Sequence, residues 1–206
     1  MLITMILSLE EAYHLLKKEK VPEHIVKHSE KVALVSLFIG CFLKEIDKNI
    51  DLHLLTVGAL LHDIKKYKSF LTGEDHALLG YEYMKKLGYE RIGDIIKAHI
   101  YLELGSLDAF ITEEEIVHYA DKRVMHEKIV SLKERFDDLK KRYGKNEQTI
   151  LRLESLERLN YLIEKRIFKR LPFTPDKIME LEKIKEVKDV LFRCVKSCSS
   201  CWWNIL

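Results

Sequence analysis

The chain has 206 residues, of which 47% are hydrophobic, and its 35 basic and 33 acidic residues leave a formal net charge of +2. This length suits one domain, or one domain with an appendage, and the apolar content is enough for a sizeable core. The near-neutral charge gives no electrostatic reason to expect a nucleic-acid polymer or a membrane surface as a partner. The apolar opening, residues 1–7, lacks the basic flank and cleavage site of a signal peptide, so we expect a cytoplasmic protein.

Helix signals dominate the first half of the chain. Ser8 and Glu11 have the spacing of a capping box, which marks the start of a helix. Pro22 fits the first position of another helix, and Asp51 and Asp75 can each cap the helix that follows them. These signals predict helices over about residues 9–20, 22–46, 52–67, 76–87 and 89–100.

The second half of the chain is also predicted to be helical. Thr112 and Glu115 form another capping-box pattern, Gly144 begins a turn, and residues 171–175 end one helix and start the next. We therefore expect helices over about residues 113–143, 147–169 and 176–195. No stretch alternates apolar and polar residues as a half-buried strand would, so the predicted fold class is all-α, without a sheet.

Residues 59–66 place His62 beside Asp63 at the end of an apolar run. A carboxylate in such surroundings must shift its pKa, pair with a cation or coordinate a metal ion. Neighbouring helix positions point about 100° apart, so both side chains reach one ion only if it lies just above the helix. The second carboxylate oxygen can then bind a second ion, at the roughly 3.5–4 Å spacing used in phosphoryl hydrolysis.

Other histidines and one more aspartate can complete such a site. Imidazole together with carboxylate suits Fe, Mn, Ni, Co or Zn rather than Ca or Mg. Cysteines are absent from the set, which argues against a closed structural zinc site. Taken singly, each histidine is more typical of a packed or capping residue than of a ligand. The candidate metal ligands are His28, His62, Asp63, His76, His99 and Asp121.

Over about residues 20–135 the chain resembles the HD-domain metal-dependent phosphohydrolases. The similar segments are His28-Ser29-x-x-Val32-Ala33, Leu61-His62-Asp63-Ile64-x-Lys66, Asp75-His76-Ala77-x-x-Gly80, Ala98-His99 and Tyr119-Ala120-Asp121-Lys122. Their order, H…HD…H…H…D, resembles the branch with two metal ions, which includes diadenosine tetraphosphate hydrolases and cyclic-di-nucleotide phosphodiesterases. The Gly-Tyr-Pro signature of the cyclic-di-GMP branch is absent after Lys66.

The resemblance implies a compact helical bundle in which Asp63 bridges two divalent ions. A metal-activated hydroxide would attack phosphorus, with Asp63 and Lys66 in catalytic roles. Lys66, Lys122 and Arg123 would bind the phosphate of a small, nucleotide-like substrate. The candidate ligands all precede residue 144, so we expect an HD-type domain over residues 1–143 and a C-terminal helical extension over 144–206, packed on it. A homodimer is left open.

Two other functions stay open, because the ligand types alone do not separate them. A di-iron oxygenase of the HD type would use the same ligands, and a non-catalytic helical binding module would keep the metal for structure. Lys66 and nearby basic residues favour a phosphate. Near the C-terminus, Cys194, Cys198 and Cys201 are more typical of free thiols or an intermolecular disulfide than of a four-ligand zinc site.

Overall fold

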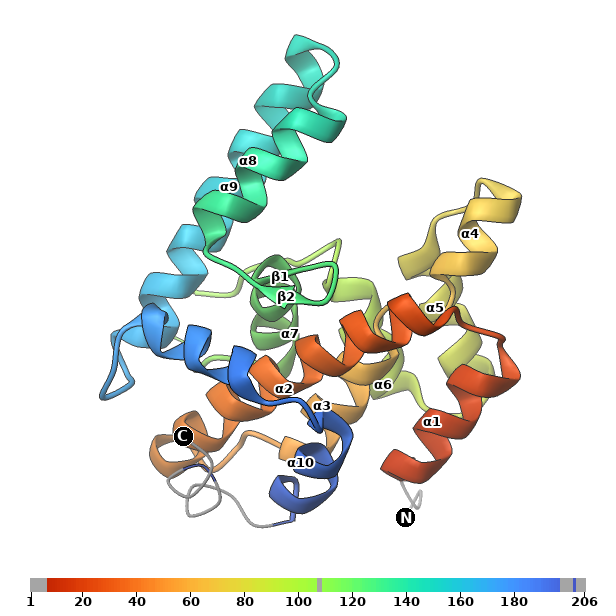
Figure 1. The fold of residues 1–206 in the computed structure, drawn as a ribbon, viewed down its shortest axis with the longest axis vertical. Helices are drawn as coiled ribbons and strands as arrows, with labels where there is room; N and C mark the ends of the chain where they lie inside the picture. The colour runs from red at the N-terminus through yellow and green to blue at the C-terminus, as the bar shows by residue number, and fades with distance from the viewer. Residues whose placement is uncertain (1–6, 107–108, 197–201, 203–206) are drawn as a thin grey trace.

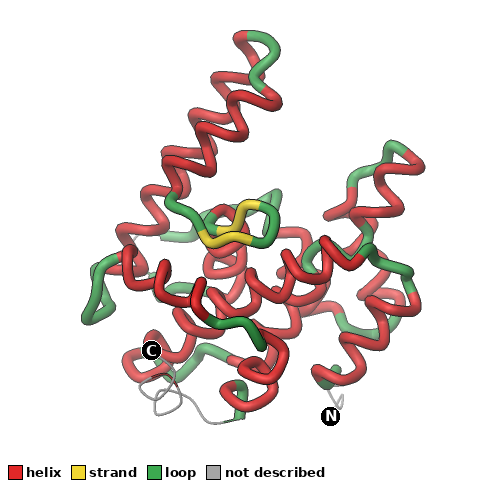
Figure 2. Tube along the Cα trace, in the orientation of Figure 1, coloured by secondary structure: helices red, strands yellow, loops and turns green. Residues whose placement is uncertain are grey.

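The computed structural model describes residues 7–106, 109–196 and 202, which form helices joined by loops and one short two-stranded sheet (Figures 1 and 2). The predicted all-α class is confirmed. In chain order the elements are α1 (Leu9–Lys18), α2 (Glu23–Ile46), α3 (Leu52–Leu61), α4 (Lys66–Thr72), α5 (His76–Lys86), α6 (Glu90–Ala98), α7 (Glu113–Lys122), β1 (Val124–Met125), β2 (Lys128–Ile129), α8 (Leu132–Tyr143), α9 (Glu147–Phe168), the 3₁₀ helix η1 (Pro175–Lys183) and α10 (Val187–Cys194).

Helix α2 is the centre of the hydrophobic core. Residues 32–41 of α2 are buried on every face, so other elements must cover it all round. Helices α3, α7 and α10 and the 3₁₀ helix η1 all pack against it. Gly40 allows α3 to approach closely, because a Cβ at this position would lie 2.4 Å from Leu55 Cδ2. His28 in α2, and His62 and Asp63 directly after α3, are therefore positioned by two helices that pack closely together.

The C-terminal segments pack on the same core as the N-terminal ones. Phe38 of α2 contacts Phe173 and Trp202, with ring centroids 5.3 and 5.2 Å away. Arg166 of α9 forms a buried ion pair with Glu115 of α7. The predicted boundary between the HD-type domain and the C-terminal extension, at residues 143 and 144, falls at the turn between α8 and α9. The division into two parts stays a prediction. Cys198 and Cys201 lie outside the described residues.

Most predicted helix starts coincide with observed capping groups. Ser8 and Glu11, and likewise Thr112 and Glu115, form complete capping boxes. The side chains of Asp51 and Asp75 accept hydrogen bonds from the first backbone amides of α3 and α5. Because these signals are local, they do not depend on the rest of the fold.

The third predicted helix, over residues 52–67, is wrong in its second half. Helix α3 ends at Leu61, and two tight turns follow, in which Ile64 N donates to Leu61 O and Lys66 N to Asp63 O. Helix α4 then leaves in a new direction (Figure 1). The His62–Asp63 pair therefore lies at a corner between two helices, where both side chains can face the same space.

The long helix predicted over residues 113–143 is also wrong, because α7 ends at Lys122 and a small β-hairpin follows. Val124 pairs with Ile129 across this hairpin, both are buried, and His126 makes the turn with a positive φ of 57°. The prediction that the fold contains no sheet is therefore wrong for this short hairpin. The last helix predicted over 176–195 is divided into η1 and α10.

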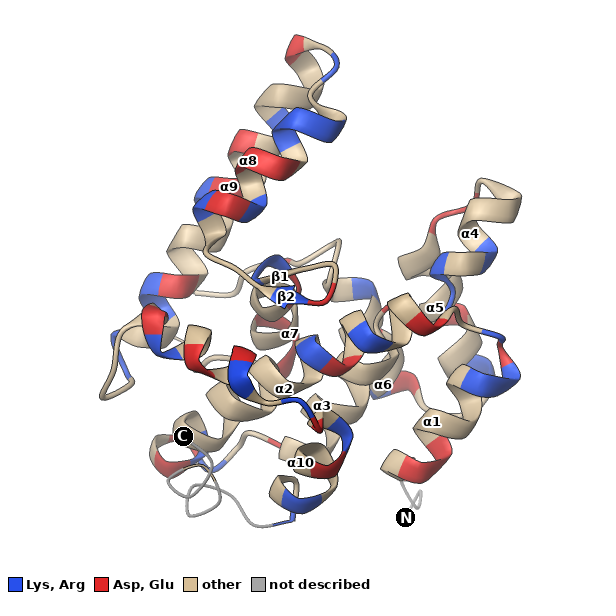
Figure 3. Cartoon of the chain, viewed as in Figure 1, with Lys and Arg blue, Asp and Glu red and all other residues tan. Residues whose placement is uncertain are grey.

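Two parts of the structure extend away from the body. Helices α8 and α9 form a long antiparallel arm, and α4 projects on another side (Figure 1). Acidic and basic residues alternate along the arm, as expected for solvated helix faces (Figure 3). None of the helices in the described ranges combines the length and the apolar character that a bilayer crossing requires.

Candidate metal centre

The structure brings the six predicted ligands together from five places in the chain. His28 comes from α2, and His62 and Asp63 from the corner after α3. The others lie at helix ends: His76 begins α5, His99 directly follows α6, and Asp121 is in the last turn of α7. Between Asp63 and each of the four histidines, the nearest nitrogen and oxygen atoms are 3.3–3.9 Å apart.

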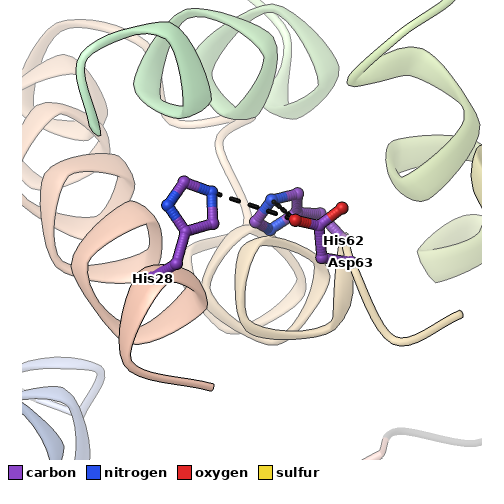
Figure 4. Close-up of side chains that lie close together, drawn as sticks. All are labelled: His28, His62 and Asp63. Carbon is purple, nitrogen blue, oxygen red and sulfur yellow. Dashed lines mark ion pairs between the residues drawn. The ribbon is translucent and has the colours of Figure 1, made fainter. Parts of the chain in front are cut away.

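The first cluster consists of His28, His62 and Asp63. One candidate ligand atom from each residue lies within 4.8 Å of the others. Figure 4 shows His28 reaching from α2 towards Asp63, which lies beside His62 at the end of α3. Asp121 Oδ1 is 3.1 Å from His28 Nε2 and 3.6 Å from His62 Nε2, so it adds a second carboxylate.

The second cluster consists of Asp63, His76 and His99. His76 Nε2 and His99 Nε2 are 3.1 Å apart, and they lie 3.3 and 3.7 Å from Asp63 Oδ1. The other carboxylate oxygen of Asp63, Oδ2, faces the first cluster. Asp63 thus offers one oxygen to each cluster, as a bridging ligand would.

Backbone carbonyls fix the orientation of three histidine rings. The Nδ1 atom of His62 donates to Ala59 O at 2.7 Å, that of His99 to Ile96 O, and that of His28 to His126 O at 2.8 Å. A carbonyl oxygen only accepts, so each Nδ1 carries a proton, and each ring is oriented with Nε2 towards the clusters. Nε2 is then the atom through which each ring could bind a metal ion.

The polar atoms in the clusters fit a divalent cation. His62 Nε2 and Asp63 Oδ1 are buried, and neither has a hydrogen-bond partner in the described part of the chain. Leaving such atoms unpaired is costly unless another group, such as an ion, satisfies them. Burial lowers the pKa of His62, but Asp63 and Asp121 outweigh it and raise this pKa to about 9. The surroundings therefore favour an added positive charge.

The remaining titratable groups are in the protonation states that ligands need. Burial raises the pKa of Asp63, but the nearby His62 and Lys66 charges hold it well below its usual value. Burial also raises the pKa of Asp121, but neighbouring charges, chiefly that of Lys122, hold this pKa well below its usual value. Burial lowers the pKa of both His76 and His99, which keeps them neutral. The clusters are thus compatible with a divalent metal, as predicted from the donor types.

A pocket of about 270 Å³ opens directly onto the first cluster. His28 and Asp63 form its inner end, and Lys66 donates from its wall to Asp63 Oδ2 at 2.7 Å. The other lining residues are His24, Ile25, Phe70, His126, Glu127, Arg135, Leu139, Arg142 and Tyr143. A molecule in this pocket would contact both Lys66 and two of the candidate metal ligands, His28 and Asp63.

The structure does not bring Lys122 and Arg123 to this pocket, although both were predicted to bind substrate phosphate. Lys122 is 5% exposed, and its Nζ donates to Asp121 Oδ2 and to His99 O. Arg123 is 2% exposed and donates to Val130 O and to the Tyr119 hydroxyl. Lys122 therefore holds two ligand-bearing segments together, and Arg123 ties α7 to the hairpin.

Arg123→Gln is expected to lower the free energy of unfolding by about 3 kcal/mol, because it removes a buried cation from Val130 O and from the partly buried carboxylate of Glu164. Urea denaturation followed by circular dichroism measures this change. Arg158→Gln, an exposed arginine on α9, is the control and should change little. Equal stability of Arg123→Gln and the unmodified protein would contradict the structural role.

The sequence did not reveal the far wall of the pocket. Arg135, Leu139 and Arg142 share one face of α8 at i, i+4 and i+7 spacing, but nothing local connects this helix to the ligands. The hairpin was missed as well, so the carbonyl of His126 was not foreseen as the partner of His28. His118 is not in the clusters: it contacts Ala98 O and Asn160, and burial lowers its pKa to about 4.

Comparison with known proteins identifies the family. The HD domain model matches residues 25–126, a range that contains all six predicted ligands. The chain belongs to the HD-domain family. A 172-residue stretch of this HD-domain protein is 28% identical to an uncharacterised protein of Methanocaldococcus jannaschii, covering 77% of this chain and 100% of that protein. No solved structure gives a significant match.

Two further relatives have a named activity. Over 141 residues the chain is 30% identical to a tRNA (cytidine(56)-2'-O)-methyltransferase of Picrophilus torridus and 27% identical to one of Thermoplasma volcanium. These matches cover 62% of this chain but only 39% and 40% of those proteins. The shared segment is thus a minor part of each methyltransferase, and its name says nothing direct about this HD domain.

Proposed function

We propose that this HD-domain protein is a phosphohydrolase that binds two divalent ions and hydrolyses a phosphoester or phosphoanhydride bond of a nucleotide-like substrate. One observation carries the proposal: Asp63 offers an oxygen to each ligand cluster, while Lys66 binds the same carboxylate from the pocket wall. Fe, Mn, Ni, Co and Zn all suit the ligand types.

The residues of the chain have distinct tasks in this proposal. His28, His62 and Asp121 would hold one ion and His76 and His99 the other, with Asp63 shared by the two sets of ligands. When bound, the ions supply an activated water and neutralise charge on the phosphoryl oxygens. Lys66 binds a phosphoryl oxygen as a point charge and offsets the negative charge that develops during attack. Side chains of α4 and α8 line the pocket that would take the substrate.

The charges in the pocket favour this function over the alternatives. Lys66, Arg135 and Arg142 all line it, and three cations beside the clusters suit a phosphate better than the substrate of a di-iron oxygenase. A non-catalytic module would have little use for an accessible lysine on its bridging ligand. The side chain of Lys66 is 35% exposed, which leaves it within reach of a bound molecule.

The test combines metal analysis with a substrate panel. Protein purified without chelators should contain about two transition-metal ions per chain. It should release phosphate or a nucleotide from one class of substrate, and chelation should stop the reaction. The panel comprises nucleoside mono-, di- and triphosphates, dinucleoside polyphosphates and cyclic nucleotides. An RNA end with a 2′,3′-cyclic phosphate is added because two relatives are named as tRNA enzymes.

Two results would contradict the proposed function. Oxygen consumption without phosphate release would favour a di-iron oxygenase. If the metal-loaded protein converts nothing in the panel and consumes no oxygen, while removal of the metal lowers its melting temperature, the centre is structural.

A further inference from the structure

The pocket continues from the metal centre onto a wall outside the HD domain. The family match ends at residue 126, whereas α8 covers Leu132–Tyr143. Arg135, Leu139, Arg142 and Tyr143 of α8 all line the pocket, and we call this set the α8 wall. It is part of the arm that extends away from the body (Figure 1).

The α8 wall has more positive than negative charge. Arg135 and Arg142 both pair with one carboxylate, that of Asp138, which does not line the pocket. The Nε atom of Arg135 is buried and has no hydrogen-bond partner among the described residues. A guanidinium with an unused, buried donor at a pocket is prepared to bind an anion, because an arginine can form two parallel bonds to a phosphate.

Lys66, on the opposite side of the pocket, is a cation that already pairs with Asp63, so it brings no negative charge to the α8 wall. Besides Asp63, Glu127 is the only acidic residue in the described part of the chain that lines the pocket. Two places for negative groups therefore follow one another along the pocket, the first at Lys66 and the metal ligands and the second at the α8 wall.

Two exposed aromatic side chains border the same pocket. Phe70 of α4 is 71% exposed, and Tyr143 of α8 is 54% exposed. Large aromatic groups exposed at a binding pocket suit stacking against a planar ring, which nucleobases provide. Phe70 and Tyr143 come from the two parts that project from the body (Figure 1).

We propose that the α8 wall binds phosphoryl groups beyond the one that is cleaved, so that the chain selects nucleoside polyphosphates over monophosphates. Arg135 and Arg142 bind the additional phosphates, and Phe70 and Tyr143 contact the base. The identity of the cleaved bond rests on the proposed function. The preference for binding polyphosphates does not, because it can be measured without turnover.

The preference is measured by calorimetric binding of two probes, β,γ-methylene-ATP and AMP, to the full chain purified with its metal. The unmodified protein should bind the polyphosphate at least about ten-fold more tightly than AMP, since each arginine–phosphate contact contributes roughly a factor of ten. The double variant Arg135→Gln/Arg142→Gln should lose most of this ratio. Arg152→Gln, an exposed arginine on α9, is the matched control and should keep it.

Aromatic contacts are tested with Tyr143→Ala against Tyr161→Ala, another exposed tyrosine of the arm. Tyr143→Ala should weaken binding of both nucleotides by about five-fold or more and leave inorganic tripolyphosphate less affected. Arg142 and Tyr143 are exposed but Arg135 is partly buried, so circular dichroism is used to check that each variant folds.

The inference fails if the unmodified protein binds AMP as tightly as the polyphosphate, or if the double variant keeps the original ratio. These outcomes are separate from failure of the proposed function. If binding follows the expected pattern but the protein hydrolyses nothing, the α8 wall is supported and the hydrolase proposal fails. If the double variant hydrolyses substrates with an unchanged preference for polyphosphates, the proposed hydrolase function is supported and the inference is overturned.

Discussion

Asp63→Asn is expected to remove metal and hydrolytic activity together. Asp63 is the one residue shared by both ligand clusters, and its two oxygens face different histidines. An amide has one oxygen acceptor and no charge, so it can serve neither cluster as a bridging anion. We expect metal content to fall from about two ions to fewer than one. The value of kcat/KM should fall more than about 100-fold, which is the upper range for loss of a residue that only supports a ligand.

Two control variants make this result specific. Asp94→Asn changes a partly exposed carboxylate on α6 and should keep both metal and activity. His28→Ala removes a ligand from the first cluster alone, so it should lose about one ion and keep the second. Metal analysis and circular dichroism on each purified variant give the readouts. A folded Asp63→Asn protein with the original metal content and rate would overturn the bridging role.

Local signals explain why the helix starts could be predicted. The capping boxes at Ser8 and Thr112 and the caps at Asp51 and Asp75 act within one turn, and all four are observed. The breaks inside helices depend on tertiary contacts instead. Nothing in residues 59–66 indicates that the helix stops at Leu61, because Ile64 follows Leu60 and Leu61 at helical spacing and is buried as they are.

One break did have a local signal. Ser131 and Glu134 form a capping box that begins α8, with the same spacing as the two boxes that were recognised. Reading it would have ended the predicted helix 113–143 before residue 131. It would not have shown that α8 reaches the metal centre, because that placement depends on the direction of the hairpin turn at His126.

The ligands could be proposed from residue type and order, whereas the roles of the basic residues could not. Lys122 and Arg123 follow Asp121 directly, but both are buried among groups of the protein itself. The position of a basic residue next to a ligand in the sequence does not indicate which way its side chain points. Lys66 differs, since the corner after α3 turns it towards both Asp63 and the pocket.

Lys66→Gln is expected to lower kcat about 100-fold while leaving the metal content unchanged. Burial lowers the pKa of Lys66, but Asp63 and Asp121 outweigh it and raise this pKa above its ordinary value. The side chain is therefore a permanent cation at neutral pH, and glutamine keeps a hydrogen-bond donor without the charge. Loss of one electrostatic contact to the transition state typically costs 10²–10³ in kcat.

Lys68→Gln is the matched control, because Lys68 is an exposed lysine on the same helix and does not line the pocket. It should behave as the unmodified protein does. Lys66→Arg should restore part of the rate, since the charge returns with a different geometry. Metal analysis separates two roles for this lysine. If Lys66→Gln loses metal in proportion to activity, Lys66 acts by holding Asp63 in place. If metal is kept and kcat falls, its charge acts on the phosphoryl group directly.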